Sequence, residues 1–332
     1  MLAGIAYAAL SGICNGLFSA PMKIIPRWKW ENIWLVFILT SCLAMPFGIV
    51  SLTVPDYALL FHRAPPAAVR TAMIFGFAWG FGAILFGRAV DRLGVSVANT
   101  LVIGLSSALG SLVPLFLNGK IAQFDRQQRL LYTGVLVFIA GVWICGGAGR
   151  KRDTVRDASQ ASADGYIFAI GAGVMSAVFN IGYALALPIA ATGEQMGYSH
   201  FLGTNCIWLL MLGCGAVPNI AYCALLARRH RSGVLFFSQR PARAWLLSIL
   251  MGILWGASIF LYGAAAPLLG DIGPSIGWPL SLAIALLTAN LMGVALDEWR
   301  GAGQGPVRRM RIGIGMLFAA IVLCALSAKT GS

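Results

Sequence analysis

The stretch GFAWGFGAILFGRAVDRLG at residues 76–94 has a counterpart in GILWGASIFLYGAAAPLLG at residues 252–270. The two align without a gap, and the identical residues are Gly76, Trp79, Gly80, Leu85, Gly87, Ala89, Leu93 and Gly94 with Gly252, Trp255, Gly256, Leu261, Gly263, Ala265, Leu269 and Gly270. An apolar helix that occurs twice predicts a protein of two related halves. The alternative is that glycine and alanine recur by composition alone, but the paired tryptophans argue against it.

The composition is that of a membrane protein. Of 332 residues, 59% are hydrophobic and 11% are charged, whereas soluble domains carry about 25% charged residues. Apolar runs of about 20 residues recur along the chain, as in membrane-spanning helices. The seven cysteines stand singly in apolar stretches, so we expect neither a metal site nor a disulfide framework.

We predict an all-α integral membrane protein with ten transmembrane helices, arranged as two inverted five-helix repeats. The predicted spans are residues 2–22, 32–55, 72–92, 94–117, 130–149, 165–190, 201–227, 244–268, 272–296 and 308–328. The first half covers residues 1–149, a polar linker covers 150–164, and the second half covers 165–332. Five spans is an odd number, so the halves would enter the membrane in opposite orientations, as in many secondary transporters.

The basic residues predict the orientation. Most of the 24 Lys and Arg residues lie in loops after the first, third, fifth, seventh and ninth spans. The positive-inside rule therefore places these loops in the cytoplasm and both termini in the periplasm. Basic residues in short loops are typical of membrane orientation, so the net charge of +13 does not indicate a nucleic-acid partner.

Uncharged polar side chains within the spans are the first candidate ligand contacts. Asn15, Ser19, Asn99, Asn180 and Asn205 lie in or at the start of apolar stretches from both halves. An amide in hydrocarbon costs several kcal/mol unless it is paired, so each should face the bundle interior or a wet cavity. Hydrogen bonding between helices is the alternative role for each residue.

Aromatic side chains are the second set of candidates. Trp79, Trp255, Trp278, Tyr183 and Tyr262 would place ring faces near a central cavity. Aromatic faces with nearby hydrogen-bonding groups suit a neutral sugar, which has C–H groups on one face and hydroxyls at its rim. Tryptophan also marks membrane interfaces, and that alternative stays open.

Ionisable residues are scarce inside the spans. Glu31, Asp91 and Glu298 are the best candidates for carrying a coupling proton, although each lies near a span end, where a solvated charge is the ordinary role. The sequence has no P-loop and no His/Glu metal spacing. We therefore expect no enzyme, no cofactor and no catalytic residues.

Several short motifs resemble the L-rhamnose–proton symporters of the drug/metabolite transporter superfamily. They are Ala20-Pro21-Met22-Lys23, Trp28-x-Trp30-Glu31-x-x-Trp34, Pro46, Phe75-Gly76-x-x-Trp79-Gly80 with Gly87, the turn Leu93-Gly94-Val95-Ser96, Asn118-Gly119, and Glu298-Trp299-x-x-Ala302-Gly303. The resemblance covers nearly the whole chain. It implies ten helices in two inverted halves, the bacterial inner membrane, and proton-driven uptake of a deoxy-sugar.

This chain departs from the family pattern at three places. It has Leu187-Pro188 where family members carry a lysine before the proline, Ala83 and Ile84 where they carry asparagines, and Pro274 near a family acid. Our leading hypothesis is a secondary carrier of a small neutral, rhamnose-like sugar. The alternatives are an exporter of a less polar metabolite and a membrane protein that does not transport. The expected partners are the solute, protons and the lipid bilayer, with a homodimer as a further option.

Overall fold

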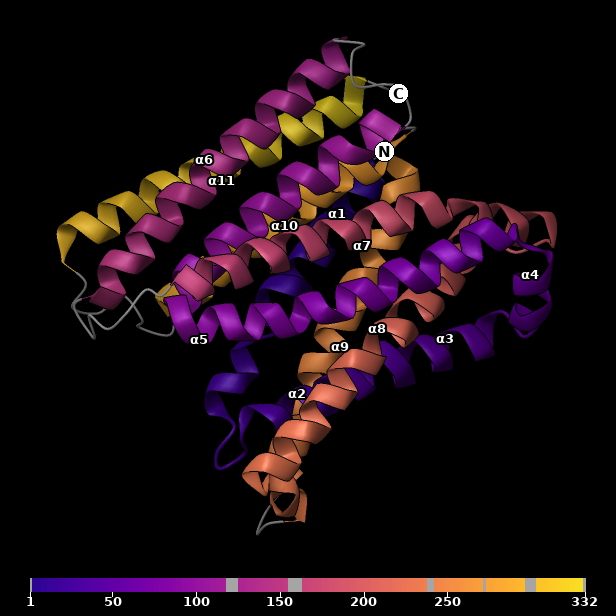
Figure 1. Ribbon diagram of the computed structural model, residues 1–332. Helices are drawn as coiled ribbons and strands as arrows, with labels where there is room; N and C mark the ends of the chain where they lie inside the picture. The colour runs from indigo at the N-terminus through magenta and orange to yellow at the C-terminus, as the bar shows by residue number, and fades with distance from the viewer. Residues whose placement is uncertain are drawn as a thin grey trace.

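The computed structural model describes residues 2–117, 125–154, 163–237, 242–270, 273–295 and 303–330. Within these ranges the regular elements are all helical (Figure 1). They are α1 Leu2–Leu17, η1 Ala20–Ile24, α2 Trp30–Ile38, η2 Leu39–Ala44, α3 Met45–Thr53, α4 Tyr57–Arg63, α5 Pro66–Leu117, α6 Arg126–Thr154, α7 Ala163–Gln195, α8 His200–His230, η3 Ser232–Phe237, α9 Ala242–Ala265, η4 Ala266–Leu269, α10 Gly273–Ala295 and α11 Gln304–Thr330.

The helices are long and apolar enough to make this a multi-pass membrane protein. Nine segments of the described chain meet the length and hydropathy of a membrane span. They coincide with the predicted spans to within a few residues, except that the span predicted at 94–117 is represented by the shorter apolar helix Leu101–Gly110. Large apolar side chains such as Ile74, Leu136 and Leu246 are exposed on the outer surface, where lipid would cover them.

Helix α5 contains the two spans predicted at 72–92 and 94–117. Its contacts with α7 run in opposite directions: Phe75 and Leu85 lie against Gly182 and Gly171, whereas Val102 and Gly110 lie against Gly173 and Asn180. The chain therefore reverses between Leu85 and Val102, and α7 packs against both arms. The backbone is helical through residues 93–96, where the sequence predicts a turn. The reversal that the predicted turn implies is present, but it is made without a loop at residues 93–96.

The second predicted span is a continuous helix whose middle segment is π-helical. Helix α2 passes into the π-helical segment η2 and then into α3. Pro46 follows this segment and has no N–H to donate, so the regular hydrogen-bond pattern is interrupted there. Thr40 and Ser41 donate their hydroxyls to the carbonyls of Val36 and Phe37 at 2.8 and 2.7 Å, which satisfies these side chains inside the helix.

The repeated glycines are packing positions. A Cβ on Gly76 would lie 2.2 Å from the carbonyl oxygen of Met211 in α8, and one on Gly80 would lie 2.4 Å from that of Gly215. These contacts confirm the close helix packing expected of small residues spaced by four.

The counterparts of these glycines in α9 pack in the same way against the second span. A Cβ on Gly252 would lie 2.6 Å from Thr40 Cβ and 3.0 Å from the carbonyl oxygen of Phe37. One on Gly256 would lie 2.5 Å from Met45 Sδ and 3.6 Å from Ser41 Cα. Each of the two helices that carry the sequence repeat thus uses its two glycines to approach a helix that is distant from it in the sequence.

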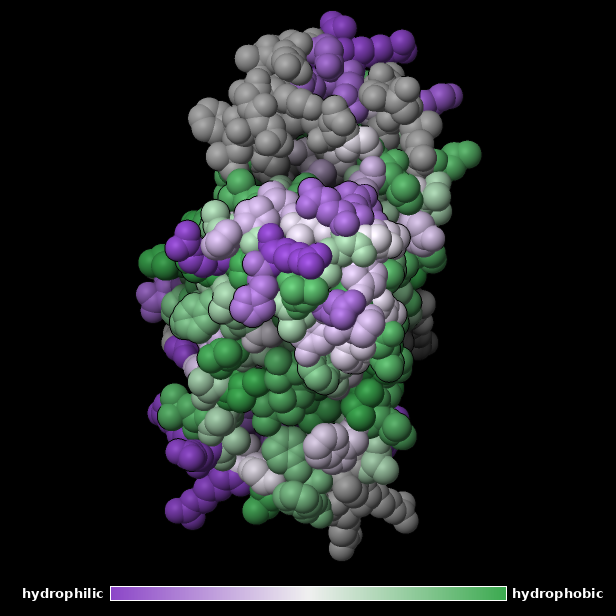
Figure 2. Space-filling view, turned by 90° about the vertical axis from the view of Figure 1, so that its right-hand side faces the viewer, coloured by the Kyte–Doolittle hydropathy of each residue, from purple (hydrophilic) through white to green (hydrophobic). Residues whose placement is uncertain are grey.

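The helix connections divide between two ends of the bundle. At the first, which we call the α4 end, α4 meets the turn between α7 and α8, where the Tyr198 hydroxyl donates to Asp56 at 3.0 Å. At the second, the η3 end, η3 packs against the start of α2, and Trp28 Nε1 donates to the carbonyl of Leu235 at 3.0 Å. In Figure 1 the α4 end is at the right and the η3 end is at the bottom. Figure 2 looks onto the α4 end, where hydrophilic residues gather above a green apolar zone.

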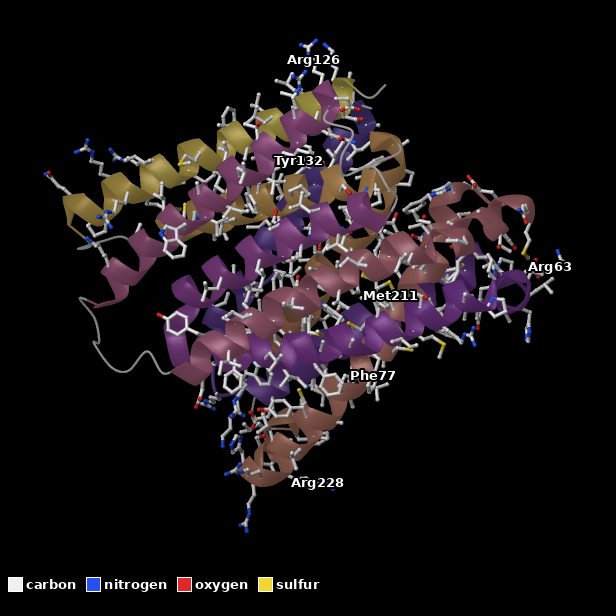
Figure 3. The ribbon with its side chains drawn as sticks, turned by 45° about the horizontal axis from the view of Figure 1, so that its top comes forward. Arg63, Phe77, Arg126, Tyr132, Met211 and Arg228 are labelled. Carbon is white, nitrogen blue, oxygen red and sulfur yellow. The ribbon has the colours of Figure 1, made fainter. Side chains whose placement is uncertain are left out.

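Three arginine side chains lie at the ends of the bundle. Arg228 projects from the lower end of α8, whereas Arg63 and Arg126 lie at the right and the top of the molecule (Figure 3). The predicted linker at 150–164 begins inside α6, which continues to Thr154, and residues 155–162 lie outside the described chain.

Candidate functional site

A cavity of about 240 Å³ lies among α1, α2, α5, α7, α9 and α10. It is larger than the cavity of about 150 Å³ that binds benzene in an engineered protein. The polar side chains in its lining are Ser11, Asn15, Ser19, Ser176, Ser258 and Ser281, and the tryptophans and tyrosine are Trp34, Trp79, Trp255, Trp278 and Tyr262. Among the described residues, its lining contains no acidic or basic side chain. Such a cavity suits an uncharged ligand with hydrogen-bonding groups.

The two repeated tryptophans meet at this cavity. The rings of Trp79 and Trp255 are stacked, with centroids 5.3 Å apart and an interplanar angle of 12°. Phe179 packs against Trp79 at 4.9 Å and Phe37 against Trp255 at 5.8 Å. The sequence placed both tryptophans near a cavity, and the structure brings them into direct contact in its wall.

One end of the cavity is closed by a hydrogen-bonded layer. The hydroxyl of Tyr262 donates to Asn180 Oδ1, and Asn180 Nδ2 donates to the carbonyl of Gly110 at 2.8 Å. Trp278 packs edge-on against Tyr262 with centroids 5.3 Å apart, and its Nε1 donates to the carbonyl of Ser106 at 3.2 Å. Asn180 is fully buried and is not part of the cavity lining, so it holds Tyr262 in place from behind.

We expect the replacement Asn180→Leu to lower the free energy of unfolding by about 2 kcal/mol, because it leaves the Gly110 carbonyl buried without its donor and the Tyr262 hydroxyl with only the Pro274 carbonyl, at 3.4 Å. Thermal unfolding of the purified protein in detergent measures this. Asn290→Leu is the matched control, since the Nδ2 of Asn290 has no partner among the described residues. The double variant Asn180→Leu/Tyr262→Phe should recover part of the loss, and an additive loss would contradict this pairing.

The opposite end of the cavity reaches the molecular surface near η1. Ser19 and Ala289 line the cavity and are exposed, and Asn15 lines it one turn deeper. The mouth therefore faces the η3 end. The predicted contacts Asn15 and Ser19 are brought to the cavity by the last turn of α1 and the residues that follow it.

Besides the predicted Ser19, further serine side chains supply polar groups at the cavity, and Ser11, Ser258 and Ser281 are ones that the sequence reasoning did not name. Ser11 Oγ donates to the carbonyl of Ser258 at 2.7 Å and lies 2.8 Å from Ser281 Oγ. Ser106 Oγ donates to Ser176 Oγ at 2.8 Å. Serine is common in membrane helices as a packing residue, so only its position beside the repeated tryptophans could have marked these residues.

Two other predicted contacts lie beyond the closed end. Tyr183 and Asn205 are fully buried and are absent from the cavity lining. Tyr183 lies one turn past Phe179 on α7, in the direction of the α4 end, and its ring stacks on Trp208 with centroids 4.5 Å apart. The structure therefore separates these two residues from the cavity that holds Asn15 and Trp79.

Glu31 lies in a second hollow at the η3 end, of about 330 Å³, which Trp30, Arg88, Tyr222 and His230 also line. The Glu31 side chain is only 3% exposed. Its Oε1 accepts a hydrogen bond from Ser232 Oγ at 2.6 Å and lies 2.9 Å from His230 Nδ1. A buried carboxylate requires such partners, so Glu31 is not the solvated charge that its position at a span end suggested.

The remaining predicted residues are outside the described part of the structure. The side chains of Asn99 and Asp91 lie on α5 in the stretch whose side chains are not described, and Glu298 lies between the described ranges.

The chain is similar over nearly its whole length to proteins named as L-rhamnose-proton symporters. A family model described as L-rhamnose-proton symport protein (RhaT) matches residues 1–329. An L-rhamnose-proton symporter of Klebsiella pneumoniae subsp. pneumoniae is 26% identical over 336 residues, covering 97% of each chain. One of Cronobacter sakazakii is 26% identical over 337 residues, covering 98% of each. One of Escherichia coli O1:K1 / APEC is 24% identical over 327 residues, covering 96% of this chain and 95% of the relative. These relatives are named as transporters and not as enzymes.

Proposed function

The chain belongs to the L-rhamnose-proton symport protein family, and from this premise we propose that it moves a small neutral, L-rhamnose-like sugar together with a proton across the bacterial inner membrane. The observation that carries the proposal is the central cavity, which combines stacked aromatic rings with serine and asparagine side chains and has no acidic or basic side chain among its described lining residues. Aromatic faces pack on the C–H face of a sugar, and the hydroxyls and amide bond its rim. We assign the sugar to this cavity, against Trp79 and Trp255.

We also propose that the halves are inverted repeats, as in other secondary transporters. The reciprocal glycine contacts support this, because Gly76 and Gly80 approach Met211 and Gly215 while Gly252 and Gly256 approach the region of Phe37 to Met45. The helices that these glycines approach share a second sequence repeat, because Ile33-Trp34-Leu35 on α2 recurs as Ile207-Trp208-Leu209 on α8. In this alignment Phe37 corresponds to Met211 and Ser41 to Gly215, which are the residues that the two pairs of glycines approach.

Transport would proceed by alternating access. The cavity is open toward the η3 end and closed toward the α4 end by Tyr262 and Asn180. The basic loops predicted to be cytoplasmic, such as that following Arg228, belong to the η3 end. We therefore assign this arrangement to the inward-facing state, with both termini in the periplasm.

Glu31 is our candidate for the proton carrier. It is buried and is held by Ser232 and His230. It also lies one helical turn before Trp34, whose ring is part of the cavity wall. A change of protonation at Glu31 would alter the contact between the start of α2 and the end of α8, which are corresponding helices of the two halves. Coupling between proton and sugar needs such a shared element.

The experiment that tests this function is uptake into proteoliposomes. Purified protein is reconstituted, a pH gradient is imposed, and accumulation of radiolabelled L-rhamnose is measured with and without a protonophore. Accumulation that the protonophore abolishes supports the proposal. Absence of uptake across a panel of sugars rejects the sugar assignment.

We expect Trp79→Leu to raise the half-saturation concentration for L-rhamnose about fivefold, because loss of an aromatic contact in a binding site is worth about 1 kcal/mol beyond its buried area. Trp143→Leu is the matched control, since that ring is 70% exposed on the lipid-facing surface of α6. Initial rates of proteoliposome uptake measure both. Equal effects of the two substitutions would contradict the placement of the sugar.

One observation favours a second candidate function. Ala83 lines the cavity at a place where the resembled family carries asparagine, so the wall is more apolar than the family pattern implies. An exporter of a less polar metabolite would fit such a wall. Efflux of that compound from inside-out vesicles, without competition by sugars, would favour this function over sugar uptake.

A further inference from the structure

Buried polar groups gather on α8, beyond the closed end of the cavity. Asn205 is fully buried, and within the described ranges neither its Nδ2 nor its Oδ1 has a hydrogen-bond partner. The Nε1 of Trp208, one turn further along the same helix, is likewise buried and unpaired among the described residues. Buried groups of this kind are unfavourable and usually have a partner in some state of the protein.

These groups lie around an aromatic layer that adjoins Tyr262. Trp208 stacks on Tyr183 and lies 6.2 Å from Tyr262 between ring centroids. A Cβ on Gly263 would lie 2.4 Å from Trp208 Nε1 and 3.0 Å from Thr204 Cγ2. Only a glycine leaves the backbone of α9 in contact with these two side chains. The layer is therefore closed by direct packing of α9 against α8.

The sequence repeat relates this closed layer to the open end of the cavity. Trp34 corresponds to Trp208, and Phe86 corresponds to Tyr262. Trp34 and Phe86 both line the open cavity, and Trp34 Nε1 donates to Asn219 at 3.1 Å. The corresponding pair, Trp208 and Tyr262, has closed the other end, and there the indole nitrogen is left without a partner. If the protein closes at the η3 end and opens at the α4 end, the residues around Trp208 become the wall of a cavity that opens at the α4 end.

We propose that Asn205 and Trp208, with Thr204 beside them, form a second sugar subsite that is closed in this structure and that bonds the hydroxyls of the cargo when the protein opens at the α4 end. This inference rests on the proposed function. The polar groups of this subsite are the two N–H donors and the oxygen acceptor of the Asn205 amide, and the indole N–H of Trp208 at the edge of an aromatic wall. The open cavity offers the same chemistry. The cargo would thus meet Asn205 first when it enters from the α4 end.

The test measures transport separately from each face. Asn205→Leu removes both amide groups, and Trp208→Phe removes the indole N–H while keeping an aromatic ring. Radiolabelled L-rhamnose is offered to vesicles of known protein orientation, from the α4 end or from the η3 end. We expect the half-saturation concentration at the α4 end to rise about three- to tenfold, the equivalent of one lost hydrogen bond. At the η3 end it should stay within about twofold of the unaltered protein.

Trp34→Phe is the matched variant, because it should raise the half-saturation concentration at the η3 end only. Equal changes at both faces for Asn205→Leu and Trp208→Phe, or no change at either, would overturn the subsite. A structural role alone would change stability or the maximal rate without this difference between faces.

A second measurement does not depend on L-rhamnose being the cargo. Asn205→Cys is placed in a background in which the seven native cysteines are replaced by serine or alanine, and a membrane-impermeant maleimide is added from one face at a time. Labelling from the α4 end alone supports an opening there. Labelling from the η3 end, or none from either, overturns it. If the unaltered protein carries no sugar while labelling from the α4 end occurs, the proposed function fails and the opening stands.

Discussion

Gly76→Ala is expected to destabilise the protein by about 3 kcal/mol or more, or to prevent it from folding. A Cβ at this position would lie 2.2 Å from the carbonyl oxygen and 2.5 Å from the Cα of Met211. Both are backbone atoms of α8, so no side-chain rotation can relieve the overlap. Overpacking of a well-packed interior typically costs 1–3 kcal/mol, and here α5 and α8 must separate by about 1 Å along a contact that also includes Gly80, which loses further dispersion contacts.

Gly213→Ala provides the control, on the partner helix and two residues from Met211. A Cβ there would meet nothing within 4 Å, and alanine is favoured over glycine inside a helix by about 1 kcal/mol. Gly213→Ala should therefore leave the melting temperature unchanged or raise it. The measurement is thermal unfolding in detergent, with the yield of monodisperse protein recorded for each variant. Similar melting temperatures for the two variants would show that α5 and α8 do not pack as described.

Part of this fold could be predicted from the sequence. The gapless repeat around Trp79 and Trp255 marks the two helices that pack through glycine, because close helix approach needs small residues at a fixed spacing. Hydropathy located the spans, since each must cross about the same apolar thickness. Hydropathy did not show that the backbone of α5 stays helical through residues 93–96 while the chain reverses. That path depends on how both arms of α5 pack against α7, which hydropathy does not report.

The candidate site was predicted only in part, for a physical reason. Trp79 and Asn15 reach the cavity, whereas Asn180 supports its floor and Asn205 lies beyond it. All four lie in apolar helices, and hydropathy alone cannot distinguish a side chain that faces a ligand from one that bonds another helix. Ser19 was predicted, but Ser11, Ser258 and Ser281 were not, because a serine hydroxyl can satisfy itself on its own helix, as Ser41 does with Phe37.

Glu31→Gln is expected to abolish the accumulation of sugar driven by a pH gradient while leaving sugar exchange intact. Glutamine has the size of glutamate and can still accept from Ser232, whose Oγ lies 2.6 Å from Glu31 Oε1, but it cannot bind and release a proton. A gradient of one pH unit is worth about 1.4 kcal/mol, which supports about tenfold accumulation for one proton per sugar. In the variant, the internal concentration should approach the external concentration and stop there.

Two assays on the same proteoliposomes separate coupling from binding. The first measures L-rhamnose accumulation under the pH gradient, and the second measures exchange of labelled for unlabelled sugar at equal concentrations and equal pH. Glu31→Gln should fail in the first and retain the second, because exchange requires only the loaded carrier to reorient. Loss of both would instead assign Glu31 a role in holding α2 against η3, and retention of both would exclude it as the proton carrier.

Glu194→Gln is the matched control, because this chain offers a second acid paired with a histidine. Glu194 Oε1 lies 3.1 Å from His200 Nδ1 at the α4 end, but its side chain is 49% exposed, against 3% for Glu31. An exposed ion pair contributes little energy and can exchange protons with water in every state of the protein, so it has no means of linking protonation to a conformational change. A buried carboxylate that joins the start of α2 to the end of α8 and to η3 has that means. Accumulation should therefore be lost with Glu31→Gln and kept with Glu194→Gln, and equal behaviour of the two variants would show that burial between α2 and α8 is not what couples the proton to the sugar.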